Sequence, residues 1–155
     1  MQKKHFIIAL LIVSVLGLVT SLYLTYNHYY PSLKGSFCDI TASVSCTVVN
    51  TGIYSKIVGI PVAVYGLAWF LMLGILSWKS WKNRETIPKL IWWNVGGLLF
   101  VAYFIYLEFL LTTLCPSCTV IHVLVALSLL LSLFLYKQFY KFWLTSELRW
   151  GDSYG

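Results

Sequence analysis

Residues 91–136 contain the stretch that decides the fold, IWWNVGGLLFVAYFIYLEFLLTTL followed by CPSC and then TVIHVLVALSLLLSLFLY. The two flanking segments, Ile91–Leu114 and Thr119–Tyr136, are apolar, and each is at least 18 residues long. A helix of roughly 20 residues crosses a hydrocarbon core of about 30 Å and satisfies its backbone polar groups without help from lipid. The segments therefore predict two transmembrane helices. Because only Cys115-Pro116-Ser117-Cys118 separates them, the helices must be antiparallel neighbours.

Two further apolar stretches, Phe6–Tyr26 and Pro61–Trp78, complete the predicted membrane domain. Only 10% of the 155 residues are charged, against about 25% in a soluble domain. Met1–Lys4 resembles the start of a signal peptide, but the apolar run exceeds 20 residues without a small-residue cleavage site, which favours a retained span. The sequence predicts an all-α membrane protein, a four-transmembrane-helix bundle with spans at about 6–27, 61–79, 89–114 and 117–137, an exterior loop at 28–60 and a tail at 142–155.

The net charge of +6 is distributed unequally between the two ends of the predicted bundle. Nine basic residues lie on the side of the termini and two on the other side: Lys3, Lys4, Lys79, Lys82, Arg84, Lys89, Lys137, Lys141 and Arg149 against Lys34 and Lys56. Basic residues concentrate on the cytoplasmic side of membrane proteins. Both termini and the tail are therefore predicted to be cytoplasmic, and the cysteines to face the exterior. The basic residues then set the topology and contact anionic lipid, without need of a nucleic-acid partner.

The exterior loop is only moderately polar, which predicts that part of it lies over the bundle. Its apolar residues Ile40, Val44, Val48 and Val49 have a spacing that suits a short amphipathic helix across the mouth of the bundle. Pro61 suits the first turn of the second span. The tryptophans near the opposite end are predicted to mark the cytoplasmic interface: Trp78, Trp81, Trp92 and Trp93.

The four cysteines are Cys38 and Cys46 in the loop and Cys115 and Cys118 in the turn. In an oxidising exterior they suit either two structural disulfides or redox chemistry. A C-x-x-C closes a strained two-residue loop, and a helix N-terminus stabilises a thiolate, so Cys115 and Cys118 favour redox chemistry. A zinc site is a further alternative, but the C-x7-C spacing of the loop pair is unusual for zinc ligands and residues 32–60 contain no His.

Two polar residues interrupt the apolar segments near the turn. Glu108 is seven positions before Cys115, and a carboxylate inside a membrane is costly, which makes it a candidate functional group. Alternatively, it lies near enough to the surface to meet water or an exterior Lys. His122 follows Cys118 by four positions on the same helix face. It suits contact with a polar head group, proton transfer, or a hydrogen bond to a neighbouring backbone.

Four motifs occur in a fixed order: Phe37-Cys38-Asp39, Ser45-Cys46-Thr47-Val48-Val49, Gly59-Ile60-Pro61-Val62-Ala63-Val64-Tyr65-Gly66 and Cys115-Pro116-Ser117-Cys118. In these motifs the chain resembles the vitamin K epoxide reductase family. The other family of four-helix membrane oxidoreductases that couple disulfides to quinones has its C-x-x-C first and its widely spaced pair second. The resemblance implies that residues 1–141 form the four-helix catalytic domain of this family in a cell membrane.

The resemblance implies a membrane disulfide:quinone oxidoreductase that supports disulfide bond formation in exported proteins. Electrons pass, on this expectation, from an exterior thioredoxin-fold protein to Cys38 and Cys46, then to Cys115 and Cys118, and then to a quinone. Cys38 corresponds to the thiol that meets the partner, Cys46 to the thiol that exchanges with Cys115, and Cys118 to the thiol closest to the quinone. Only a short tail follows Lys141, so the partner is expected to be a separate protein.

The resemblance also marks a quinone pocket. Tyr54, Tyr65 and Trp69 align with pocket aromatics, whose flat apolar faces suit a quinone ring but would equally fill a helix bundle. Asn50 is a candidate polar contact. His122 falls at the position of a pocket tyrosine in the animal enzymes.

Two other positions depart from the animal enzymes. Gly52, beside Thr51, replaces a serine, and Val62 replaces a pocket asparagine. The second change bears on carbonyl recognition, so quinone reduction is expected rather than epoxide reduction. Two alternatives stay open. One is a vitamin K quinone or epoxide reductase, which uses the same cysteine relay. The other, from a different class, is a non-catalytic membrane scaffold with two structural disulfides.

Overall fold

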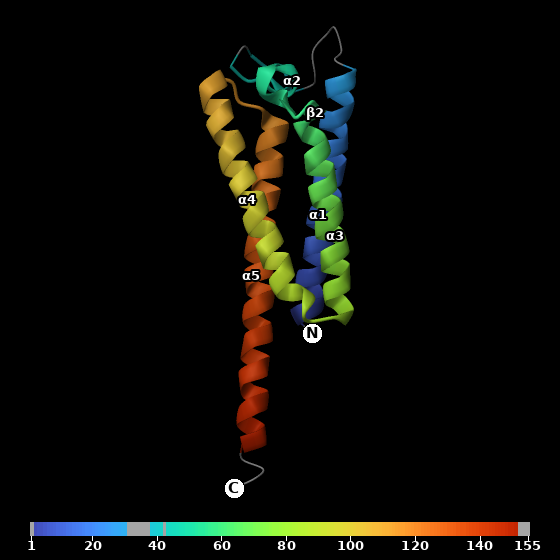
Figure 1. Ribbon diagram of the computed structural model, residues 1–155, viewed down its shortest axis with the longest axis vertical. Helices are drawn as coiled ribbons and strands as arrows, with labels where there is room; N and C mark the ends of the chain where they lie inside the picture. The colour runs from blue at the N-terminus through green and yellow to red at the C-terminus, as the bar shows by residue number, and fades with distance from the viewer. Residues whose placement is uncertain (1, 31–37, 42, 152–155) are drawn as a thin grey trace.

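The structure, a computed structural model, describes residues 2–30, 38–41 and 43–151. Its four long helices form a bundle: α1 (Gln2–Tyr29), α3 (Val62–Lys82), α4 (Thr86–Leu111) and α5 (Pro116–Gly151) (Figure 1). Each is long and apolar enough to cross a membrane. The predicted all-α, four-helix membrane fold is therefore confirmed. Of the residues given a role above, Met1, Lys34, Phe37 and the last four of the tail lie outside the described residues.

Short elements gather at one end of the bundle, here called the cap end (Figure 1). They are α2 (Cys46–Thr51), the 3-10 helix η1 (Ile53–Ser55) and the antiparallel strands β1 (Lys56–Ile57) and β2 (Ile60–Pro61). The connection from α4 to α5 lies at the same end, whereas the start of α1, the α3–α4 turn and the end of α5 lie at the opposite end. The cap end thus brings both cysteine-containing segments together.

The helix boundaries differ from the predicted spans for local reasons. Asn83 Oδ1 accepts a hydrogen bond from the Glu85 N–H (2.9 Å), so the α3–α4 connection needs only residues 83–85. Thr112 takes a left-handed conformation (φ 51°), which ends α4 before the predicted residue 114. The backbone of α5 continues to Gly151, so most of the predicted tail extends the last helix.

Small residues let α1 and α3 approach closely. Gly17 lies against the ring of Phe70, and Ser14 Oγ donates to the Phe70 carbonyl oxygen across the two helices (2.7 Å). Ser14 and Ser21 in turn lie against Gly74 and Gly66 of α3. In a membrane, helices associate through such close packing and hydrogen bonding, because lipid provides no hydrophobic drive. The α1–α3 pair is therefore the tightly packed half of the bundle.

A buried polar cluster joins α4 to α5. Asn94 is fully buried, and its Nδ2 donates to the Leu90 carbonyl oxygen (2.8 Å) and to Ser132 Oγ (3.0 Å). Ser128 Oγ donates to Asn94 Oδ1. Every polar atom of the Asn94 amide group has a partner, which is the condition under which a buried polar residue stabilises a membrane bundle.

The cap differs from the predicted amphipathic helix. Helix α2 begins only at Cys46, where Ser45 Oγ accepts from the Val48 N–H (3.2 Å) as an N-cap. Ile40 and Val44 lie outside it, because the chain turns back between Thr41 and Val44. A hairpin follows that was not predicted, with Val58 and Gly59 at positive φ in its turn. Pro61 is the N-cap of α3 and not part of its first turn.

The tryptophan prediction was wrong for one residue. Trp78, Trp81 and Trp92 are exposed on the bundle surface, as interfacial residues are. Trp93 is half-buried, stacks on Trp69 with ring centroids 6.5 Å apart, and donates its indole N–H to the Trp69 carbonyl oxygen (3.3 Å). It faces the interior because it lies on the face of α4 that meets α3.

Replacing Gly17 with Val should destabilise the bundle. A Cβ at this position overlaps the buried Phe70 ring, and overpacking of this kind costs about 1–3 kcal/mol. We expect a lower thermal midpoint of the purified protein in detergent, measured by loss of helical circular dichroism. The matched control is Gly96→Ala, where a Cβ meets nothing within 4 Å. Equal midpoints for the two variants would contradict the packing described here.

Candidate active site

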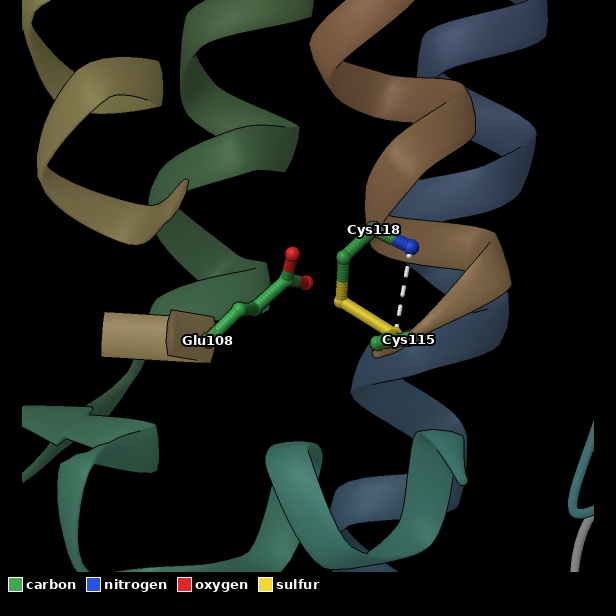
Figure 2. Close-up of side chains that lie close together, drawn as sticks. All are labelled: Glu108, Cys115 and Cys118. Carbon is green, nitrogen blue, oxygen red and sulfur yellow. Dashed lines mark hydrogen bonds between the residues drawn. A yellow bond between two sulfur atoms is a disulfide. The ribbon is translucent and has the colours of Figure 1, made fainter. Parts of the chain in front are cut away.

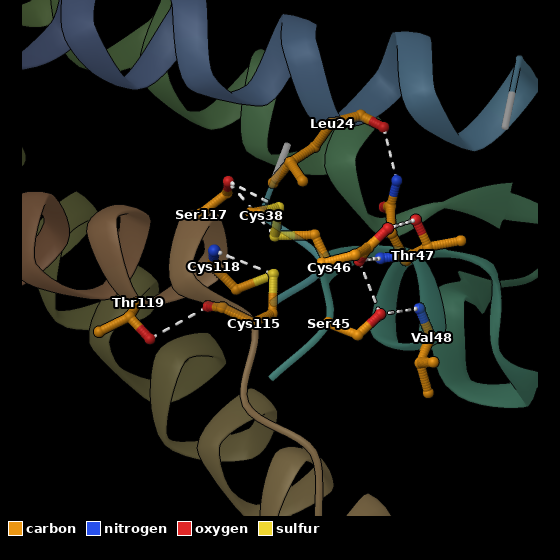
Figure 3. Close-up of a disulfide and its surroundings, with 12 residues drawn as sticks. Leu24, Cys38, Ser45, Cys46, Thr47, Val48, Cys115, Ser117, Cys118 and Thr119 are labelled. Carbon is orange, nitrogen blue, oxygen red and sulfur yellow. Dashed lines mark hydrogen bonds between the residues drawn. A yellow bond between two sulfur atoms is a disulfide. The ribbon is translucent and has the colours of Figure 1, made fainter. Parts of the chain in front are cut away.

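The four cysteines form two adjacent disulfides at the cap end (Figure 3). Cys38 pairs with Cys46 at a Cα–Cα distance of 5.8 Å, and Cys115 pairs with Cys118 at 5.2 Å. Cys38, Cys46 and Cys115 are buried in one cluster, against which Cys118 packs. The structure therefore brings together the loop pair and the C-x-x-C pair, which are far apart in the sequence.

Ser117 lies between the two disulfides. Its Oγ is 3.5 Å from Cys46 Sγ and 3.7 Å from Cys38 Sγ. Disulfide sulfurs carry no hydrogen, so the hydroxyl group is the donor in either contact. The residue inside the C-x-x-C motif thus contacts the loop pair directly, and the two disulfides face one another across the start of α5 (Figure 3).

Asp39 fixes the loop pair in place. Its carboxylate accepts from the Thr47 N–H (3.0 Å), from Thr47 Oγ1 (2.6 Å) and from Ser45 Oγ (2.7 Å). Asp39 directly follows Cys38, and Ser45 and Thr47 flank Cys46. A carboxylate at the N-terminus of α2 also meets the positive end of the helix dipole. These contacts hold both cysteines of the pair at one helix start.

The start of α5 positions the C-x-x-C pair. Cys115 directly precedes the helix, and the Cys118 N–H donates to Cys115 Sγ (3.2 Å). Thr119 Oγ1 donates to the Cys115 carbonyl oxygen (3.1 Å). A backbone N–H from the first turn of a helix stabilises negative charge on a cysteine sulfur, which favours release of Cys115 as a thiolate from a disulfide with another cysteine.

The two sulfurs of this pair face different surroundings. Cys115 is completely buried (0% exposed) within the cysteine cluster. Cys118 lines a cavity of about 340 Å³ between α3, α4 and α5, beneath α2 and η1. The volume lies within the roughly 300–1,000 Å³ typical of small-molecule sites. Cys118 is the one cysteine among the described residues that line this cavity.

All six residues expected in the quinone pocket line this cavity: Asn50, Tyr54, Val62, Tyr65, Trp69 and His122. Two of them are already engaged in hydrogen bonds. Asn50 Nδ2 donates to the Leu24 carbonyl oxygen (2.7 Å), and the Tyr65 hydroxyl donates to the Ile57 carbonyl oxygen (3.1 Å). These bonds attach the cap to α1 and α3, and they leave Asn50 Oδ1 and the Tyr65 oxygen able to accept further hydrogen bonds.

One wall of the cavity, which α4 provides, was not predicted from the sequence. Its lining residues recur every three or four positions: Trp93, Gly97, Phe100, Phe104, Leu107 and Leu111. This helical period was readable in the sequence, but apart from Asn94 and Glu108 the positions from 91 to 111 are apolar, so polarity did not distinguish the cavity face from the lipid face. Gly97 has a particular role, because a Cβ there would overlap the Trp69 indole.

Glu108 lies on the same wall, close to the C-x-x-C pair (Figure 2). A carboxylate oxygen and the sulfurs of Cys115 and Cys118 all lie within 4.8 Å of one another. Glu108 is buried, which disfavours the alternative that its carboxylate lies near enough to the surface to meet water. A zinc site would need thiolate ligands, whereas the four cysteine sulfurs are paired as two disulfides in this structure.

Comparison with known proteins agrees with this geometry. The model of the vitamin K epoxide reductase family matches residues 8–133, which cover all four cysteines and most of the bundle. A comparison with curated proteins finds no significant match. The family's proteins use quinones as redox partners. In this chain the cavity is lined mainly by apolar side chains and reaches Cys118 of the C-x-x-C pair. The chain, a multi-pass membrane oxidoreductase, belongs to the vitamin K epoxide reductase family.

Proposed function

We propose that this protein is a disulfide:quinone oxidoreductase that passes electrons from an exterior thiol protein to a quinone in the membrane. The observation that carries the proposal is the division of the C-x-x-C pair. Cys115 contacts the loop disulfide, whereas Cys118 faces the cavity. One cysteine pair therefore contacts both a thiol relay and an apolar binding site.

The relay begins when a thiolate of a thioredoxin-fold partner attacks Cys38. The attack forms a mixed disulfide between the partner and Cys38 and releases Cys46 as a thiolate. The second partner thiol then attacks the partner's own sulfur in this bond and releases Cys38 as a thiolate, which oxidises the partner and reduces the loop pair. Cys46 next attacks Cys115, and Cys118 leaves. Cys38 resolves the Cys46–Cys115 bond, which restores the loop disulfide and leaves Cys115 and Cys118 reduced. The contiguous cluster of Cys38, Cys46 and Cys115 supports these steps.

The cavity supports a quinone as the final acceptor. A bound quinone accepts two electrons and two protons. Trp69 and Tyr54 offer aromatic faces to a ring, Asn50 Oδ1 and His122 offer polar contacts near Cys118, and the wall of α4 is apolar apart from Glu108. The cap covers the cavity at this end and limits the access of water to Cys118.

Vitamin K epoxide reduction is the nearest alternative, since it uses the same relay. Val62, at the position of the animal asparagine, adds only apolar surface to the cavity. This favours quinone reduction over epoxide reduction, and a direct epoxide-turnover assay distinguishes the two substrates.

Replacing Cys118 with Ala should abolish quinone reduction by the pre-reduced protein. Without this sulfur no disulfide can form next to the cavity, so we expect a loss of more than about a hundredfold in the anaerobic reduction of ubiquinone-1, followed by absorbance. Cys38→Ala is the matched variant, because it should keep this half-reaction and lose oxidation of the thiol partner. If Cys118→Ala still oxidises a reduced partner in the presence of quinone, the relay is wrong, and the scaffold alternative stays open.

Ser117→Ala should slow the exchange between the two cysteine pairs. The hydroxyl donates to the loop sulfurs, and loss of one such hydrogen bond costs about 0.5–1.5 kcal/mol, or roughly a threefold to tenfold lower rate. The measurement is rapid acid quenching after reduction of the loop pair, with mass-spectrometric mapping of the disulfides. Direct reduction of quinone by a pre-reduced Cys115–Cys118 pair should be unchanged. An unchanged exchange rate would show that Ser117 only fills space.

The topology can be tested with a membrane-impermeant thiol reagent. From the positive charges near the termini, we expect labelling of reduced Cys38 and Cys46 from outside intact cells. Inverted vesicles should show no labelling until they are opened by detergent. Labelling of the loop cysteines in sealed inverted vesicles would place the cap on the cytoplasmic side and contradict the proposed exterior partner.

A further inference from the structure

Glu108 is a buried acid that the relay proposed above does not use. From α4, its side chain points toward the disulfide at the start of α5 (Figure 2). Its carboxylate oxygen lies within 4.8 Å of the sulfurs of both Cys115 and Cys118. The side chain is 7% exposed, and its Oε1 has no hydrogen-bond partner. An unpartnered carboxylate oxygen at a reactive sulfur pair calls for an explanation, since structural acids are normally paired.

The surroundings of Glu108 provide no neutralising charge. The other ionisable groups that line the cavity are Tyr54 from η1, Tyr65 from α3, and Cys118 and His122 from α5. Among the described residues that line it, none is Lys, Arg or Asp. The backbone N–H of Cys115 faces the carboxylate. The acid is therefore positioned by the cysteine turn itself and not by an ion pair.

We propose that Glu108 is the proton-transfer residue of the quinone half-reaction, and that it shares one exchangeable proton with Cys118 in the reduced protein. This inference rests on the proposed function. Both groups line the same cavity, and the carboxylate oxygen lies within 4.8 Å of the Cys118 sulfur, so a proton that leaves the Cys118 thiol has this carboxylate as an acceptor within short reach. From there it is delivered into the cavity where the quinone oxygen lies.

The half-reaction balances with this assignment. Oxidation of the Cys115–Cys118 dithiol breaks two S–H bonds, forms one S–S bond and releases two electrons and two protons. Both electrons and both protons pass to the quinone, which becomes a quinol. The proton from Cys118 passes to the carboxylate of Glu108 and from there to the quinone. Glu108 therefore has the same protonation state at the end of the cycle as at the start.

The shared proton follows from electrostatics. A thiolate on Cys118 and an ionised Glu108 would place two negative charges within 4.8 Å in an apolar cavity without a cation. Two acids at such a distance titrate as a coupled pair, in which the second proton leaves only at higher pH. Removal of the carboxylate charge therefore makes the Cys118 thiolate easier to form. It also removes the group that returns the proton, so thiolate formation and quinone reduction should change in opposite directions.

The first measurement needs no quinone. The full-length protein is reduced under anaerobic conditions and treated with iodoacetamide across a range of pH, and mass spectrometry maps alkylation at Cys118. In Glu108→Gln, which keeps the shape of the side chain, we expect half-alkylation about one pH unit or more lower than in the wild type. Glu108→Asp should stay close to the wild type. His122, Tyr54 and Tyr65 are present in all variants, so the difference isolates Glu108.

The second measurement uses ubiquinone-1 as the acceptor. Despite its more readily formed thiolate, pre-reduced Glu108→Gln should reduce the quinone roughly a hundredfold more slowly, since general acid–base groups contribute about 10²–10⁴-fold to rates. Glu108→Asp should recover part of the rate. Glu85→Gln, which removes an exposed carboxylate at the other end of α4, is the matched control and should change neither measurement.

Either an unchanged alkylation profile or an unchanged rate of quinone reduction in Glu108→Gln overturns the inference. Glu108→Ala, which removes the unpartnered polar atoms together with the charge, gives the same two tests if the Gln variant does not fold. The outcome is separable from the proposed function. If Cys118→Ala still reduces quinone, the relay fails whatever Glu108 does, whereas loss in Cys118→Ala with full activity in Glu108→Gln keeps the relay and removes only Glu108.

Discussion

The site depends on the backbone pairing between the cap loop and the α4–α5 connection. The Leu114 N–H donates to the Ser43 carbonyl oxygen (2.9 Å), and the Ser45 N–H donates to the Leu114 carbonyl oxygen (3.0 Å). These bonds place Cys46, one residue after Ser45, beside Cys115, one residue after Leu114. They form because Thr112 ends α4 early and frees three residues for pairing with the loop. A longer α4 would leave the loop without this partner.

The membrane fold was readable from the sequence because its cause is local. Lengths of apolar sequence dictate transmembrane helices, and the C-x-x-C turn dictates that α4 and α5 are neighbours. The cap was predicted less well. The apolar spacing of Ile40, Val44 and Val48 fits a helix. Val44 instead forms a backbone bridge with Leu114, which is distant in sequence, and this long-range pairing overrides the local preference for a helix.

The same distinction holds within the site. The four cysteines and the six pocket residues could be proposed from motifs, and the structure places them around one cavity and one sulfur cluster. The wall formed by α4 could not be proposed from the sequence, because lipid-facing and cavity-facing residues are equally apolar in a membrane helix. Trp93 shows the problem, since a tryptophan near a helix end reads as interfacial until α3 is known to lie beside it. Glu108 was the readable polar signal in this helix, whereas the role of Asn94 in joining α4 to α5 became visible only in the structure.

The unequal burial of Cys115 and Cys118 has a consequence for where electrons can be lost. Cys115 is enclosed by the cysteine cluster and other protein atoms, whereas Cys118 also borders the cavity beneath the cap. A small thiol or oxidant dissolved in water then has no direct access to Cys115, and it reaches Cys118 only by entering the cavity. In the proposed cycle the protein is an insulated junction between an aqueous thiol pool and a quinone pool in the lipid, and electrons pass between the two only through the cysteine pairs.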